Sequence, residues 1–214
     1  RNMPCNASEA TSMFQRRRIG LPDFPITMAM IHNEPGAHPY STQVLKDAIA
    51  FIEEQYGEKY DWNALFARAE HMNEQNRIEL EKWELFKTPY SALCGIAESL
   101  YRLYGWASVN GQEDQFTYND RKVLKIMLDA YQRRHEPFGG TTRHRAFVWG
   151  PSAVYYTDFP TWVQNCWGIN IVLNMDSTMG HNMISTTDPE QAIQDLALFS
   201  EKGVMRHHAV GGWE

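Results

Sequence analysis

The segment RAFVWGPSAVYYTDFPTWVQNCWGINIVLN, residues 145–174, decides the fold class. Its two ends, 145–149 and 169–174, are short apolar runs that predict strands. Between them Asp158 begins a predicted helix, and Gly168 separates that helix from the second strand. A strand, a helix and a second strand in this order predict parallel strands in an α/β fold.

The segments on either side extend this α/β pattern. Downstream, Asp188-Pro189 is a good helix start, and that helix is expected to end at about Gly203. Upstream, residues 23–31 form a short apolar run that predicts a buried strand of a parallel sheet. A helical stretch over 7–18 precedes this run. A helix followed by a strand is the closing part of an α/β unit.

Residues 41–142 form a helical section between the two α/β parts. Its first helix is expected over 41–57, and Asp61 is expected to cap a longer helix. Further helices are expected over 91–104 and 119–134. On the longer helix a stripe recurs at steps of three and four, and a polar residue interrupts it: Leu65, Ala69, Met72, Asn76, Leu80 and Trp83.

The chain is therefore divided into the end of a first α/β domain (1–40), the helical section (41–142) and the start of a second α/β domain (143–214). The first α/β unit has no beginning within these residues, and the second has no end. Two incomplete sheets joined by a helical section are not expected to form a stable independent fold. We expect the chain to be the central part of a longer polypeptide.

The composition is that of a globular protein. Hydrophobic residues make up 43%, charged residues 21%, and the formal net charge is −6. This charge argues against a nucleic-acid binder, which needs a basic face, and the run Arg16–Arg18 is too short to reverse it. That run is interpreted as a solvated helix end, or else as a contact for a phosphorylated ligand such as coenzyme A. No apolar run approaches the ~18 residues of a membrane span.

Three cysteines, Cys5, Cys94 and Cys166, are too far apart for a zinc finger or a disulfide framework. Reduced thiols in a cytoplasm fit best. Cys94 and Cys166 are interpreted as small buried hydrophobic residues of predicted helices. The usual catalytic motifs are absent, and His207 and His208 are adjacent, a spacing that disfavours a shared metal ion on a strand.

Cys5 has a different setting. It follows Pro4 and precedes Asn-Ala-Ser-Glu, which can start a helix. The dipole and the free N–H groups of a helix N-terminus favour the thiolate, which is the form that binds iron. Cys5 is therefore the candidate metal ligand among the three cysteines.

Several local features in a fixed order reveal a resemblance. A Cys-Asn pair at Cys5 precedes a helix and a strand, and the junction Ile52–Asp61 and the run Asn73–Arg77 follow. Later a strand closes in Gly150-Pro151. In this order and spacing, over nearly all of its length, the chain resembles the 2-hydroxyacyl-CoA dehydratase and benzoyl-CoA reductase family.

The resemblance implies similar pairs of subunits, each with two Rossmann-like parallel-sheet domains joined by a helical section. Both domains would be incomplete in these residues. It also implies a 4Fe-4S cluster held by three cysteines from distant loops, of which Cys5 matches the second. The other two ligands are expected outside residues 1–214, because neither Cys94 nor Cys166 matches a ligand position.

The implied activity is the removal of water from an (R)-2-hydroxyacyl-CoA. An ATP-hydrolysing iron–sulfur activator protein would deliver one electron, the thioester carbonyl would become a ketyl radical, and the 2-hydroxyl would leave. Oxygen would destroy such a system, so the resemblance implies the cytoplasm of an anaerobe. Asn6 and Ala7 are expected to donate backbone N–H groups toward the cluster sulfurs.

Two further groups of residues are candidates for roles near the site. Gly150, Pro151 and Ser152 follow a predicted strand, at the edge where ligands bind in open α/β sheets, and are candidate substrate-binding residues. Asn76 and Arg77 are expected to tie the helical section to a sheet, with a contact to substrate as the alternative.

Two other functions stay open. One is a subunit of an ATP-dependent aromatic acyl-CoA reductase of the benzoyl-CoA type. The other belongs to a different class, a cluster-free scaffold or interaction subunit, and the aromatic, Met-rich helical section supports it. Iron content and absorbance separate the enzyme from the scaffold.

Overall fold

The computed structural model describes residues 22–28, 34–90, 113–136, 142–148, 159–174 and 182–201, with the single positions 14, 16, 18, 20 and 140. The chain divides into two compact units, residues 1–70 with 182–214 and residues 71–181. The predicted boundaries at residues 40 and 142 stay a prediction.

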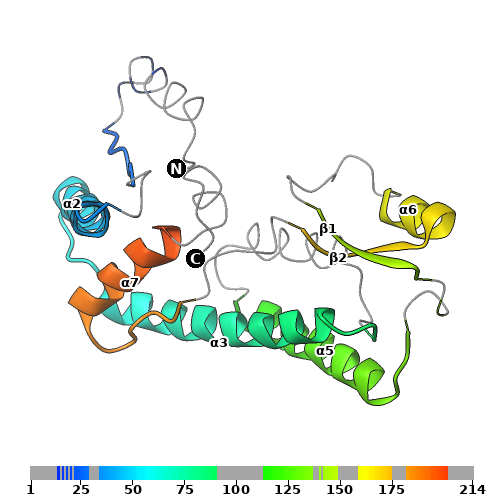
Figure 1. Ribbon diagram of the computed structural model, residues 1–214. Helices are drawn as coiled ribbons and strands as arrows, with labels where there is room; N and C mark the ends of the chain where they lie inside the picture. Colours follow the sequence, from blue (N-terminus) through cyan, green and yellow to red (C-terminus); the bar gives the residue numbers. More distant parts are fainter. Residues whose placement is uncertain are drawn as a thin grey trace. The chain divides into compact units, whose positions relative to one another are not determined.

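Seven elements follow one another along the described chain (Figure 1). They are α2 (Ala37–Tyr56), α3 (Trp62–Phe86), α5 (Glu113–Gln132), β1 (His144–Val148), α6 (Phe159–Trp167), β2 (Ile169–Asn174) and α7 (Pro189–Glu201). The two strands pair in parallel, as predicted. A largely helical chain with a small parallel sheet is compatible with the α/β class, and the two Rossmann-like domains stay a prediction.

The β1–α6–β2 segment is the unit that the opening stretch of sequence predicted. The strands are in register from His144 opposite Ile169, with one irregularity after Ala146, and α6 packs on β2. Gly168 makes the turn from α6 into β2 with φ of 66°, a left-handed conformation that favours glycine. Its carbonyl accepts hydrogen bonds from the Arg143 and His144 N–H groups, at 2.7 and 3.1 Å. The start of β1 is therefore fixed to the start of β2.

Helix α5 packs along the second half of α3 in the same direction. Near their starts, Gln75 Nε2 donates to Thr117 Oγ1 at 3.2 Å, and near their ends Leu85 and Phe86 pack with Met127. Among the described residues, an apolar cluster therefore lies toward the carboxyl ends of the two helices. The residues packed around it are Trp83, Val123, Leu124 and, from the sheet, Val172.

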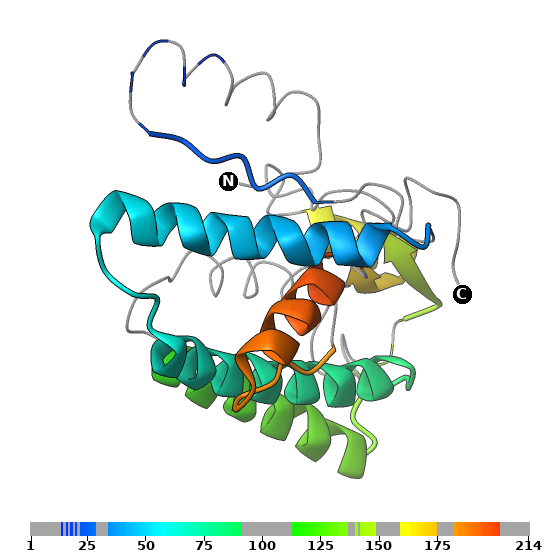
Figure 2. The same ribbon diagram turned by 90° about the vertical axis from the view of Figure 1, so that its left-hand side faces the viewer.

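In the other unit, α7 packs on α2 (Figure 2). The Asp188 carboxylate accepts the Glu190 and Gln191 N–H groups and so caps α7, as predicted. On α2, Gly57 ends the helix with φ of 70° and donates its N–H to the Glu53 carbonyl.

Apart from the start of α5, which was expected at residue 119 and lies at Glu113, three predictions of structure were wrong. Residues 22–28, the described part of the predicted strand 23–31, form no strand, because Pro25 has no N–H to donate to a ladder and Phe24 instead stacks on Phe51 of α2. Helix α2 begins at Ala37 rather than Ser41, since proline at position 39 is tolerated within the first turn.

The third concerns which side of α3 is buried. Leu80, predicted to face inward, is 40% exposed, whereas Asn73, Asn76, Glu79 and Lys82 are buried. The predicted helices over 7–18 and 91–104 include too few described residues to compare.

Candidate functional site

The predicted site residues fall outside the described part of the chain. Cys5 and Asn6 precede the first described position, and Gly150, Pro151 and Ser152 lie between β1 and α6. Their roles therefore stay predictions. The structure does describe β1, which ends at Val148, two residues before Gly150.

The carboxyl ends of the two strands lie together. Val148 at the end of β1 is the register partner of Asn174 at the end of β2. In parallel sheets the segments that follow such ends begin at one edge, and this edge is where ligands bind in open α/β folds. The parallel pairing therefore supports a ligand site where residues 150–152 follow β1.

A second group of chemically capable residues lies between α3 and α5. The Lys82 ammonium contacts Glu79 Oε2 at 3.3 Å on its own helix and the Asp120 carboxylate on α5. Trp83 Nε1 donates to the other Glu79 oxygen at 3.1 Å. The side chains of Lys82, Glu79 and Asp120 are at most 2% exposed. We call Glu79, Lys82 and Asp120 the charged cluster.

The burial of the charged cluster decides what it can do. Water is excluded, so each charge depends on its protein partners, and the removal of one partner leaves another charge without compensation. A group without solvent contact does not meet a diffusing substrate. The charged cluster therefore has a structural role, because it fixes the position of α5 along α3.

Sequence reasoning missed the charged cluster, although a signal was present. Polar residues recur every third position at Asn73, Asn76, Glu79 and Lys82, so each is a neighbour of the next on the surface of α3. Only Asn76 was noticed, as an interruption of an apolar stripe. The structure shows that this polar row is buried, together with the apolar Ile78, Leu85 and Phe86 of the same helix.

Asn76 and Arg77, predicted to tie the helical section to a sheet, have different settings. Asn76 is 6% exposed and belongs to the buried polar row, whereas Arg77 is exposed. Two cross-helix contacts flank this row, Gln75 to Thr117 and the Arg121–Glu74 ion pair at 2.5 Å.

The junction that carries the family resemblance has a clear structural role. The Glu53 carboxylate at the end of α2 accepts the Tyr60 N–H at 2.9 Å and the Lys59 ammonium at 3.0 Å. These two bonds, in this order, hold the pKa of Glu53 below its ordinary value. Burial, and then the charge of Asp61, raise the pKa of Tyr60. Asp61 Oδ1 accepts the Ala64 N–H and caps α3.

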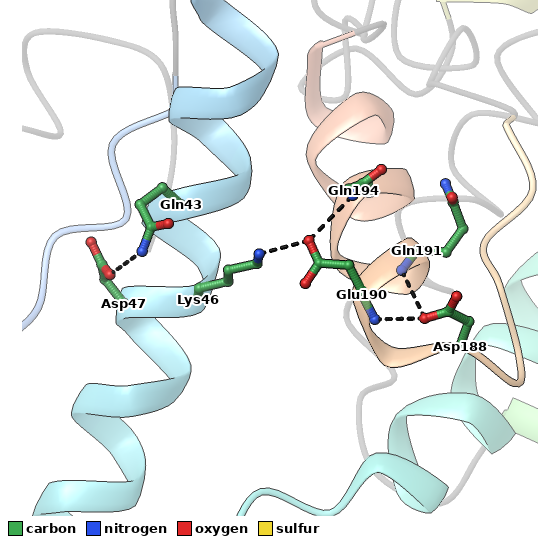
Figure 3. Close-up of polar contacts among 7 residues, drawn as sticks. All are labelled: Gln43, Lys46, Asp47, Asp188, Glu190, Gln191 and Gln194. Carbon is green, nitrogen blue, oxygen red and sulfur yellow. Dashed lines mark hydrogen bonds and ion pairs between the residues drawn. The ribbon is translucent and has the colours of Figure 1, made fainter.

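A corresponding contact joins α7 to α2 (Figure 3). The Lys46 ammonium lies 2.6 Å from Glu190 Oε1, and Gln194 Nε2 donates to the same oxygen at 3.2 Å. Both bonds lower the pKa of Glu190, the one from Lys46 more. This pair is exposed, which distinguishes it from the charged cluster.

Cys166 corrects one prediction. It was expected to be a small buried residue, but it is exposed at the end of α6. The side chains at 165–167 are all exposed because the face of α6 that packs on the sheet is formed by Val163 and Gln164. Cys94 lies outside the described residues.

The basic run near the start of the chain has local partners. Arg16 Nε lies 2.5 Å from Asp23 Oδ2, and the Arg18 guanidinium lies 5.0 Å from the centre of the Phe14 ring. Both arginines are exposed, in line with a solvated helix end. A contact of this run with a phosphorylated ligand stays a prediction.

Among the described residues, no group of three His, Cys, Asp or Glu side chains could hold a metal ion. In the same part of the chain, no helix has both the length and the apolar character needed to cross a membrane.

Comparison with known proteins identifies the family. No curated protein matches the chain. Residues 2–207 match the family described as 2-hydroxyglutaryl-CoA dehydratase, D-component. This match covers the junction at Glu53, the charged cluster and the parallel β1–α6–β2 unit. The chain therefore belongs to the 2-hydroxyglutaryl-CoA dehydratase D-component family.

Proposed function

We propose that the chain is an iron–sulfur subunit of a 2-hydroxyacyl-CoA dehydratase, a carbon–oxygen lyase that removes water from an (R)-2-hydroxyacyl-CoA. The observation that carries this proposal is the family match over residues 2–207. The family description names a dehydratase component, and this favours the dehydratase over an aromatic acyl-CoA reductase.

We assign Cys5 as a ligand of a 4Fe-4S cluster, with Asn6 close to the cluster sulfurs. The proposal is supported by the family and by the setting of the thiol after Pro4, where a helix N-terminus favours the thiolate. It rests on no described residue. When bound, the cluster would supply one low-potential electron to the thioester carbonyl.

The part that the chain's own elements play is to bind and orient the acyl-CoA. The carboxyl ends of β1 and β2 are register partners, and Gly150, Pro151 and Ser152 follow β1. We assign these three residues to the substrate site, because ligands of open α/β folds bind where segments follow the carboxyl ends of parallel strands. The electron is returned after each turnover, so the net reaction is the loss of water alone.

The family also supports a complex with a partner component. We propose that this partner is a homologous second subunit, and that an ATP-hydrolysing iron–sulfur protein activates the pair in the cytoplasm of an anaerobe. A cluster-free scaffold subunit is the alternative that the first experiment tests.

The decisive experiment is anaerobic purification of the full-length protein with its partner subunit, followed by iron analysis and an absorbance spectrum. We expect bound iron and sulfide, and loss of iron when Cys5 is replaced, C5S. An iron-free, colourless wild-type protein would overturn the enzyme proposal in favour of the scaffold.

Cys166 provides the matched control. Its thiol is exposed on α6, and no metal-holding group lies among the described residues around it. The C166S variant should therefore keep the iron content and the activity of the wild type. Equal loss of iron in C5S and C166S would show a general effect of cysteine replacement and remove Cys5 from the site.

A further inference from the structure

Helix α5 has two sides of opposite character. The side turned to α3 carries the buried residues Thr117, Asp120 and Met127. The other side carries residues that recur at steps of three and four, so they form one stripe along the helix. The members of this stripe are exposed or half-exposed, and they are Tyr118, Lys122, Lys125, Ile126, Asp129 and Arg133. We call these six residues the outer face of α5.

The two lysines of the outer face have no acidic partner among the described residues. Lys122 lies over the Tyr118 ring, 4.4 Å from its centre, and Lys125 forms no ion pair in this part of the chain. Asp129 follows Lys125 by four residues, but its carboxylate lies 3.6 Å from Arg133. Each of the other described lysines pairs with a carboxylate: Lys46 with Glu190, Lys59 with Glu53, Lys82 with Glu79 and Asp120, and Lys87 with Glu84.

The spacing of these cations is unfavourable in the free helix. Arg121 and Lys125 lie four residues apart, and Lys122 and Lys125 lie three apart, so like charges are neighbours on the helix surface. Glu74 compensates Arg121 at 2.5 Å, whereas neither lysine is compensated. An acidic surface placed against the outer face would remove this repulsion. Since the whole chain has a formal net charge of −6, the basic face is a local feature and not a general attraction for anions.

Apolar side chains lie among the cations of the outer face. Ile126 is 55% exposed and lies one turn after Lys122, and Tyr118 is 49% exposed and lies one turn before it. A protein surface can offer carboxylates and apolar side chains together, whereas binding to a nucleic acid depends chiefly on contacts between cations and phosphates. The outer face therefore fits an acidic protein surface better than a nucleic acid.

The lysines also indicate what kind of protein contact this is. Lysine is depleted in the cores of stable interfaces, whereas charged faces steer the encounter of partners and make it sensitive to salt. In the proposed function, the component that binds and leaves again is the activator protein that delivers the electron. We propose that the outer face of α5 docks an acidic surface of this activator protein. This inference rests on the proposed function.

The test reverses the two uncompensated charges and compares them with a paired lysine. In the reconstituted complex of the full-length protein with its partner subunit, we expect K122E/K125E to raise the activator concentration for half-maximal activation about tenfold, because electrostatic steering is lost. Added salt should raise this concentration in the wild type and change it little in the variant. The matched control is K87E, the same charge change at an exposed lysine that pairs with Glu84, and it should match the wild type.

Two further variants separate docking from folding. K122Q/K125Q removes both charges without adding carboxylates, so it should shift the half-maximal concentration in the same direction by a smaller factor. K122R/K125R keeps both charges and should restore the wild-type response to the activator and to salt. The melting temperature and iron content of each variant show whether the complex is intact before activation is measured.

The other outcomes overturn the proposal in distinguishable ways. Equal half-maximal concentrations in K122E/K125E and K87E would remove the outer face from docking and leave the proposed function intact. Loss of the partner subunit from K122E/K125E during purification would assign this face to the permanent subunit contact instead. Nucleic acid retained by the wild type and not by K122E/K125E would assign it to a nucleic acid. A wild-type complex that the activator does not switch on would overturn the proposed function, and the docking surface with it.

Discussion

The α3–α5 contact and the α2–α7 contact join helices by opposite means. Between α3 and α5 the charged cluster lies buried, with the Lys82 ammonium between two carboxylates. On α2 the buried residues are small, namely Ala37, Ser41, Thr42 and Ala48, and the ion pair Lys46–Glu190 to α7 is exposed, at 38% and 56% side-chain exposure.

This difference shows where an ion pair contributes to the stability of a fold. An exposed pair keeps its water, gains little and is screened by salt, so its removal changes stability little. A buried cluster has lost its water, so the remaining charges have no substitute for a removed partner. A lysine–carboxylate pair is therefore expected to contribute little to stability at the α2–α7 contact and much more at the α3–α5 contact.

The largest expected effect comes from Lys82→Met. It leaves the Glu79 and Asp120 carboxylates buried without their ammonium, and we expect a loss of about 3–5 kcal/mol in the free energy of unfolding. Chemical denaturation followed by circular dichroism measures this loss. Lys46→Met is the matched control at the exposed pair, and its loss should be close to the error of measurement.

A second variant tests the same idea if K82M does not fold. Replacing all three charges by uncharged residues, in E79Q/K82M/D120N, removes the buried charge and should recover most of the stability. Equal losses in K82M and K46M would contradict the contrast between the two contacts.

An intermediate effect is expected on the buried side of α2. Ala48 is 6% exposed on α2, so Ala48→Leu adds bulk to a close-packed surface and should cost about 1–3 kcal/mol. Ala50→Leu makes the same change two residues away, where the side chain is exposed, and should leave the unfolding curve unchanged. A larger loss in A50L than in A48L would show that the buried side of α2 does not need small residues.

The smallest effect is a pH dependence at the exposed pair. The pKa of Glu190 is lowered in the folded protein, chiefly by the Lys46 ammonium. The contribution of the pair is therefore fully present above the ordinary glutamate pKa of about 4.3, and is lost as pH falls through the lower folded pKa. The pKa of Glu190, measured by NMR titration, should therefore be higher in K46M than in the wild type, and an unchanged or lower pKa in the variant would contradict the assignment.

The sequence predicted the local elements better than the burial. β2 has the predicted bounds, and Asp61, Asp188 and Gly57 begin or end helices as expected, because caps and turns depend on neighbouring residues. The described part of the strand predicted over 23–31 was wrong, because Pro25 cannot donate to a ladder and an apolar run becomes a strand only beside a partner strand.

The candidate site shows the same limit. Lysine is a residue type that usually lies on the protein surface. The burial of Lys82 depends on its ion pair with Asp120, which lies 38 residues later in the chain. Arg145 of β1 likewise donates to the carbonyls of Lys87 and Phe86, which lie 58 and 59 residues earlier. A single sequence shows the periodic polar row, but it does not show which charged residue of another helix will pair with that row. Cys5 was noticed because its signal, a proline followed by helix-starting residues, is local.

The segment before α7 has a consequence for the order of folding. Asp195 accepts the Ser185 N–H at 2.8 Å through its carboxylate and the Asn182 side-chain amide at 2.9 Å through its carbonyl, over separations of 10 and 13 residues. Loops this short close within about a microsecond, whereas contacts at separations like that of Lys82 and Asp120 require a longer search. We therefore expect the contacts within residues 182–201 to form before the buried charges of α3 and α5 meet.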